Sequence, residues 1–185
     1  MKKRLIYIGI LVLIVATNSH AAFIEFTDEG TLVNTNDVAY FQFTFDTDVS
    51  DVNIWTDSYN DGANFDPSIV LWGSGDEFLR INSDNSRVNP ATQSTFDAGM
   101  SFPLMLAGQY TLSVLIDGNM PVGNSISQGF TYDATPTLPI SSGGNWRLWV
   151  TGNSVEKIPE PGVLLLLLVA VGSLAFNVKK QSIVN

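Results

Sequence analysis

Two acidic runs in the first half of the chain contain the residue types that bind calcium. Asp46-Thr47-Asp48-Val49-Ser50-Asp51 and Asp57-Ser58-Tyr59-Asn60-Asp61-Gly62 gather carboxylate, hydroxyl and amide oxygens in and beside turns, and calcium prefers such oxygen ligands. The second run departs from an EF-hand loop, because Tyr59 stands at its third position and Ser68 at its twelfth. Asp, Asn and Gly are also ordinary turn residues. Two interpretations stay open: solvated turns, or a calcium site with ligands among Asp46, Asp48, Asp51, Asp57 and Asp61.

Two tryptophans offer a second chemistry, which is stacking on sugar rings. Trp55 falls on the polar side of its expected strand, and Trp149 is opposite in phase to Trp146. Trp55 and Trp149 are therefore the candidates for an exposed aromatic platform, and packing in the core or at a sheet edge is the alternative. Trp72 follows Leu71 in an apolar run and is expected in the core.

Catalysis has few candidate residues in this chain. The only histidine is His20 and there is no cysteine, so the chain beyond it cannot form a Ser-His-Asp triad, a cysteine nucleophile or a His/Cys zinc site. Two carboxylates could serve a glycoside hydrolase, but no spacing singles out a pair among Asp66, Glu77, Asp84 and Asp97. We expect no enzymatic activity and no catalytic residue, with a carboxylate-based hydrolase as the lesser alternative.

The charges of the chain are divided between its middle and its ends. All eighteen Asp and Glu lie between Glu25 and Glu160, where only four basic residues occur, so this span has a net charge of −14. The other five basic residues lie at the two ends. An acidic body of this kind repels a phosphate backbone, and we expect no nucleic-acid partner.

The N-terminus has the pattern of a secretory signal peptide. A basic Met1–Arg4 precedes the apolar stretch Leu5–Ala16, and Ser19 and Ala21 are small residues at the −3 and −1 positions of a cleavage site. We expect residues 1–21 to be removed on export, with an uncleaved anchor helix as the alternative. Without cysteine, the exported domain has no disulfides and is held by its core.

A second apolar stretch, Val163–Val178, lies near the C-terminus and is followed by Lys179 and Lys180. As a helix, its sixteen residues would rise about 24 Å, which is short for a bilayer core of about 30 Å but spans it with thinning or lysine snorkelling. The lysines would stay on the cytoplasmic side by the positive-inside rule. The acidic body would then face the periplasm, as the signal peptide also requires.

This end of the chain, with Pro159-Glu160-Pro161 before the apolar stretch and Lys179-Lys180 after it, resembles the PEP-CTERM tail of exported bacterial proteins. The resemblance implies recognition and processing by a membrane protease-transpeptidase, the exosortase. The protein would be anchored in the inner membrane first and released to the envelope or the extracellular space afterwards. Family tails usually close with several arginines, whereas residues 181–185 here follow two lysines. A plain single-pass anchor is the alternative.

The span between the two apolar ends has the periodicity of β-strands. Residues alternate in Tyr40–Phe45 and Val49–Thr56, and Ser68–Trp72 is almost wholly apolar. Further strands are predicted at Glu77–Asn82, Tyr110–Ile116 and Trp146–Val150, separated by turn signals such as Asp61-Gly62 and Asp117-Gly118. The predicted core residues are Phe41, Phe43, Val52, Ile54, Ile69, Leu71, Leu112 and Val114.

Short strands with frequent turns predict an all-β, antiparallel β-sandwich of jelly-roll type, and a barrel is the alternative. We assign residues 1–21 to the signal peptide and 22–151 to the sandwich. Residues 152–161 are a linker that contains the Pro-Glu-Pro motif. Residues 162–180 form the transmembrane sorting helix with its basic end, and 181–185 are a short tail.

Three segments of the body, Asp37–Phe43, Phe65–Trp72 and Gly108–Leu112, together with the turn Asn82–Ser86, resemble the bacterial pre-peptidase C-terminal (PPC) domain. The resemblance covers roughly residues 37 to 117 and implies a β-sandwich without catalysis of its own, of which some members bind calcium. We therefore expect an envelope or matrix protein with a structural or adhesive role. The alternative is a calcium- or carbohydrate-binding module of an exopolysaccharide layer.

Overall fold

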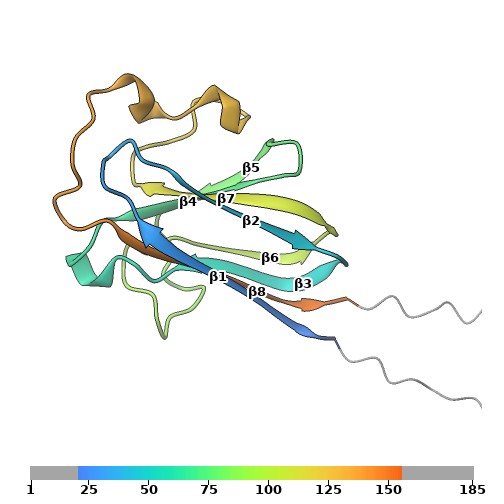
Figure 1. Ribbon diagram of the computed structural model, residues 1–185. Helices are drawn as coiled ribbons and strands as arrows, with labels where there is room; N and C mark the ends of the chain where they lie inside the picture. Colours follow the sequence, from blue (N-terminus) through green and yellow to red (C-terminus); the bar gives the residue numbers. More distant parts are fainter. Residues whose placement is uncertain (1–20, 156–185) are drawn as a thin grey trace, which may run out of the picture. The chain divides into compact units, whose positions relative to one another are not determined.

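Alternating apolar and polar residues build eight strands in the computed structural model, which describes residues 21–155 (Figure 1). The strands are β1 (Phe23–Thr31), β2 (Ala39–Phe45), β3 (Val49–Thr56), β4 (Pro67–Trp72), β5 (Phe78–Asn82), β6 (Gly99–Met105), β7 (Gly108–Ile116) and β8 (Asn145–Ser154). Three single 3₁₀ turns lie in the connections: η1 (Asn60–Gly62), η2 (Ile126–Gln128) and η3 (Thr131–Ala134). The predicted all-β class is confirmed, since the described residues contain no α-helix.

The strands form two four-stranded antiparallel sheets, in the orders β1-β8-β3-β6 and β2-β7-β4-β5, packed face to face as a β-sandwich. The antiparallel pairs are nested: β1 pairs with β8, β2 with β7, β3 with β6 and β4 with β5. Successive pairs alternate between the two sheets. Because the sheets are separate, the barrel alternative is wrong and the predicted sandwich is confirmed.

The main core fills the space between the two sheets. Seven of the eight predicted core residues are buried there, and the eighth, Phe41, is partly buried against them. The aromatic residues of β2 continue this packing at its edge, where Phe43 lies 5.6 Å from the ring of Tyr110 on the neighbouring strand. The period-two pattern therefore assigned the correct face of β2, β3, β4 and β7 to this core.

A second, smaller core lies on the outer face of the β2-β7-β4-β5 sheet. Val70, Trp72 and Leu115 are buried there with Phe130, which belongs to the segment that runs from β7 to β8 and contains η2 and η3. The indole Nε1 of Trp72 donates a 2.8 Å hydrogen bond to Ser113 Oγ. Because β4 is covered on both faces, its sequence is apolar apart from Ser68 and does not alternate.

Two strands were absent from the sequence prediction, and both lie at an edge of the same sheet. On β1 the inward-facing positions include Asp28 and Gly30, which break the apolar alternation. On β6 Pro103 removes a backbone donor, and a proline is tolerated in a sheet mainly on an edge strand. Edge strands need less burial than central ones, so their sequence signal is weaker.

Strand β8 continues to Ser154, so residues 152–154 belong to the sandwich and not to the linker that was predicted to start at residue 152. Gly152 is buried in the sheet, and a Cβ at this position would lie 2.5 Å from Val49 Cγ1. Its glycine therefore provides a close approach between strands and does not mark a flexible connection.

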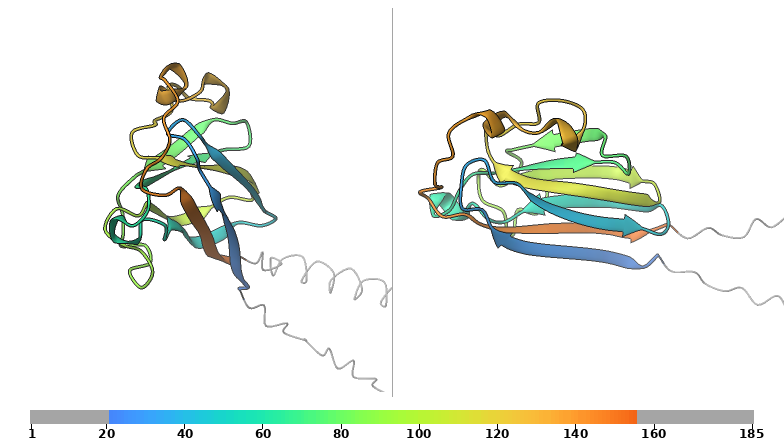
Figure 2. Two further views of the ribbon diagram at one scale, coloured as in Figure 1. Left: turned by 60° about the vertical axis from the view of Figure 1, so that its left-hand side comes forward. Right: turned by 45° about the horizontal axis from the view of Figure 1, so that its top comes forward.

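The two ends of the sandwich leave it side by side (Figure 2). Phe23 is opposite Asn153 in the β1–β8 register, Ala22 N donates to Ser154 Oγ at 2.8 Å, and Ser154 N donates to the carbonyl oxygen of Ala22 at 2.9 Å. The start of β8, at Asn145, is about 30 Å away along the strand. Any segment that precedes residue 21 or follows residue 155 is thus joined to the same end of the domain.

Several predicted features lie outside the described residues. These are the signal peptide apart from Ala21, which precedes β1, and the whole C-terminal signal: Ser19, Pro159, Glu160, Pro161, Lys179 and Lys180. They stay predictions.

Candidate functional site

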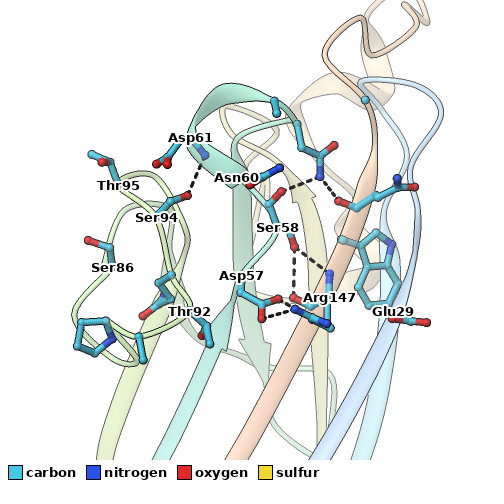
Figure 3. Close-up of a pocket in the computed structure, with 18 residues that line it drawn as sticks. Glu29, Asp57, Ser58, Asn60, Asp61, Ser86, Thr92, Ser94, Thr95 and Arg147 are labelled. Carbon is cyan, nitrogen blue, oxygen red and sulfur yellow. Dashed lines mark hydrogen bonds and ion pairs between the residues drawn. The ribbon is translucent and has the colours of Figure 1, made fainter.

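An open groove of about 950 Å³ (Figure 3) lies at the end of the sandwich opposite its two chain ends (Figure 1). One wall is the connection after β3, residues 57–64, and the other is the loop between β5 and β6, residues 86–95. Residues 143–147 at the start of β8, together with Glu29 of β1, complete the lining. Four parts of the chain that are far apart in the sequence therefore build one concave surface.

An ion pair between Asp57 and Arg147 lies in this groove. Arg147 donates from Nε to Asp57 Oδ1 at 2.8 Å and from Nη2 to Asp57 Oδ2 at 2.7 Å. The side chain of Asp57 is only 2 % exposed, whereas that of Arg147 is 49 % exposed. Hydrogen bonding to Asp57 raises the pKa of the Arg147 guanidinium. The arrangement presents an oriented cation that is held from behind by a buried carboxylate.

The two candidate tryptophans lie beside this ion pair and against each other. Trp55 and Trp149 are opposite one another on β3 and β8, with ring centroids 5.9 Å apart and planes inclined by 9°. Trp149 Nε1 donates to Asp57 Oδ2 at 3.1 Å, and the guanidinium of Arg147 lies 5.5 Å from the Trp149 ring centroid. Trp55 is 7 % exposed and Trp149 is partly buried. The structure thus brings together the two predicted platform residues, but it leaves only Trp149 in partial contact with solvent.

Asp97 connects the two walls of the groove through hydrogen bonds. Its buried carboxylate accepts hydrogen bonds through Oδ1 from the backbone N–H groups of Ser58, at 2.7 Å, and Tyr59, at 3.0 Å. Through Oδ2 it accepts from both the backbone N–H and the hydroxyl of Ser94, at 2.8 and 3.1 Å. Thr56 Oγ1 is a further donor, at 3.1 Å. One carboxylate therefore fixes the positions of both loops.

The lining of the groove is mainly hydroxyl and amide side chains, among them Asn60, Ser86, Thr92, Thr95 and Asn145. Asn64 adds rigidity, because its Nδ2 donates to the carbonyl oxygens of Ser58 and Asn145. The charged members are Arg147 and the carboxylates Glu29, Asp57 and Asp61. Such a surface can form many hydrogen bonds and has a small excess of negative charge.

The five predicted calcium ligands are divided between the two ends of the sandwich. Asp46, Asp48 and Asp51 lie at the β2–β3 turn and the start of β3, whereas Asp57 and Asp61 lie in the groove wall. Asp48 Oδ1 accepts a hydrogen bond from Ala107 N, and Asp57 is occupied by Arg147. Across residues 21–155, no three acidic, histidine or cysteine side chains are close enough to hold a metal ion. Calcium binding at these residues stays a prediction that the geometry does not support.

The four carboxylates considered for hydrolysis do not form an obvious pair either. Asp97 has its hydrogen-bonding capacity filled by the loops, and Glu77 Oε2 accepts from Gly75 N within a turn. Asp66 lies near Asp84. Burial raises the pKa of Asp66 to about 6, and the nearby negative charges of Asp117, Asp84 and Asp97 contribute to this rise. Its Oδ1 is buried and, among the described residues, has no hydrogen-bond partner.

Sequence reasoning did not single out Arg147 or recognise the role of Asp97. The only local signal for Arg147 is its place between Trp146 and Trp149 on a strand, where an arginine can lie over an indole. Asp97 has no local signal, because its partners are about 40 residues away along the chain as well as in its own loop.

The comparisons with known proteins do not assign this chain to a family. No protein-family model matches it, and no curated protein sequence matches it. Within residues 21–155, no helix has the length and apolar character needed to cross a membrane.

Proposed function

We propose that this chain is an exported bacterial envelope protein, sorted by a PEP-CTERM-type tail, whose domain acts by binding and not by catalysis. The domain is a sandwich of jelly-roll type, an assignment that the nested strand pairs support. The signal peptide and the transmembrane helix of this proposal rest on the sequence alone.

The adjacency of the two domain ends is the observation that supports this role most directly. Residues 22 and 154 are hydrogen-bonded to each other at one end of the sandwich, and the groove lies at the other. A domain tethered through residue 155 therefore presents the groove on the side away from its tether. This is the geometry expected of a protein that displays a binding surface.

Exosortase processing can be tested through the predicted recognition elements. We expect wild-type protein to be shortened and released in a host that has the exosortase, and to stay full-length in the membrane of a host that lacks it. Glu160→Ala and the double change Lys179→Ala/Lys180→Ala should each leave the protein unprocessed in both hosts. The size and location of the product report the outcome. Equal processing of the wild type and both variants would show that the tail is a plain anchor.

A further inference from the structure

The lining of the groove matches a ligand rich in hydroxyl groups. Hydroxyl and amide side chains both donate and accept hydrogen bonds, and those of Asn60, Thr92 and Thr95 lie in the groove (Figure 3). A volume of about 950 Å³ is near the upper limit for small-molecule sites. An apolar ligand would remove these polar groups from water without replacing their hydrogen bonds. A polyhydroxylated ligand would replace the lost hydrogen bonds to water with hydrogen bonds to its own hydroxyl groups.

The charges around the groove disfavour an anionic ligand. Among the described residues that line it, Arg147 is the only cation, and that charge is already paired with Asp57. Glu29 and Asp61 are exposed carboxylates of the same lining, within a body whose net charge is −14. A uronic acid, a phosphate or a sulfate would therefore meet net repulsion.

Arg147 is placed to donate to a neutral ligand. Its Nε and one Nη2 hydrogen bond are used by Asp57, but a guanidinium has five N–H groups. About half of the side chain is exposed at the groove. The remaining donors have a fixed direction, because the bidentate contact with Asp57 holds the guanidinium plane.

The groove exists before a ligand arrives, since its walls are tied together. Asp97 joins Ser58 and Tyr59 of one wall to Ser94 of the other. A preformed site lowers the conformational entropy that is lost on binding.

We propose that this groove binds an uncharged oligosaccharide. The inference names a ligand class for the proposed binding role and rests on that role, but not on the sorting signal. Sugar contacts come from Arg147 and the hydroxyl and amide groups of the two walls. The partly exposed Trp149 lies against Arg147 but is not part of the groove lining. The face-on stacking on Trp55 that the sequence suggested is not part of the proposal, because Trp55 is buried.

A matched pair of alanine-to-tryptophan variants tests the groove. Ala91 is exposed and lines it, so Ala91→Trp places an indole in the ligand's path. Ala134 is equally exposed, but it belongs to η3 and lies outside the groove lining, so Ala134→Trp is the control. Melting temperatures of both variants close to that of wild type would show that the fold is retained.

The probes are maltohexaose, cellohexaose, mannohexaose and N-acetylchitohexaose, with hexaguluronate as the anionic comparison, titrated calorimetrically into the full chain in detergent. We expect at least one neutral hexasaccharide to bind, Ala91→Trp to weaken it at least about tenfold, and Ala134→Trp to change it less than about twofold. The proposal is overturned if no neutral probe binds at millimolar concentration, if Ala91→Trp binds like wild type, or if hexaguluronate binds most tightly. None of these results affects the tail-processing test, so failure of the ligand proposal and failure of the sorting proposal can be told apart.

Discussion

Asp57 and Arg147 are 90 residues apart in the sequence and form a bidentate ion pair across the β3–β8 interface. The carboxylate is almost fully buried and the guanidinium is half exposed. The pair therefore does two things at once: it neutralises a buried charge, and it holds a cation in a defined direction at the groove.

Arg147→Ala should lower the free energy of unfolding by about 1–3 kcal/mol, because it leaves the buried carboxylate of Asp57 without its charged partner. The double variant Asp57→Asn/Arg147→Ala should lose less than the sum of the two single changes, since the buried charge is then removed as well. Urea unfolding of all four proteins measures this coupling. Strictly additive effects would show that the two side chains act independently.

Asp97→Ala should lower the free energy of unfolding by at least about 2 kcal/mol, because several buried donors lose their shared acceptor. Amide hydrogen exchange should accelerate at Ser58, Tyr59 and Ser94 more than in the main core. The control is Asp61→Asn, which changes an exposed carboxylate in the adjacent turn and should be nearly neutral. Unchanged exchange at Ser94 would mean that Asp97 does not hold that loop.

Asp66 should make the domain less stable as the pH rises from about 4 to about 6. Its pKa in the folded protein is about 6, above the ordinary value of 3.8, so the folded state keeps a proton that the unfolded chain has lost. Asp66→Asn should therefore melt at a higher temperature than wild type near neutral pH, and the difference should vanish below about pH 4.

Melting temperatures measured across this pH range test the assignment to Asp66. Asp46→Asn, at the opposite end of the sandwich, controls for the general loss of one negative charge from an acidic protein. A pH profile that is the same in Asp66→Asn and Asp46→Asn would contradict the assignment.

Gly152→Ala should lower the free energy of unfolding by about 1–3 kcal/mol, the usual cost of overpacking. The added methyl group would lie 2.5 Å from Val49 Cγ1 and 3.2 Å from the carbonyl oxygen of Ser50, so β3 and β8 must move apart. Gly75→Ala is the control, since its Cβ would meet only the flexible end of Glu77 at 3.1 Å. Equal stability of Gly152→Ala and wild type would mean that residue 152 is outside the cooperative sheet.

Alternation and apolar runs along the chain were enough to predict six of the eight strands. The prediction for Val49–Thr56 agrees with β3 in both bounds. It missed β1 and β6, because Asp28, Gly30 and Pro103 are tolerated only where one side of the strand has no neighbour. Which residues of a strand face the core can be read from the local sequence. Whether a strand lies at an edge, and so tolerates residues that break the pattern, depends on the completed sheet.

The groove could not be predicted from local pattern, because the contacts that bring its walls together join distant segments, such as Asp57 with Arg147 and Ser58 with Asp97. Trp55 was assigned to the polar face, and the β3–β8 register does place it opposite Trp149 on that face. Its burial could not be inferred, since it depends on which residues lie beside it once the sheets and loops have formed. The role of Asp97 likewise needs two loops to meet around one carboxylate.

The position of β8 has a mechanical consequence for a tethered, ligand-bound protein. A pull between the groove at the Asn145 end and a tether beyond Ser154 acts along β8, which is hydrogen-bonded to β1 on one side and β3 on the other. Because these bonds are perpendicular to the strand, they are loaded in shear and must rupture together. Pulling Ala22 and Val155 apart instead would unzip β1 from β8 one pair at a time. If the domain is held at its C-terminal end alone, a pull on a ligand in the groove therefore loads β8 in shear.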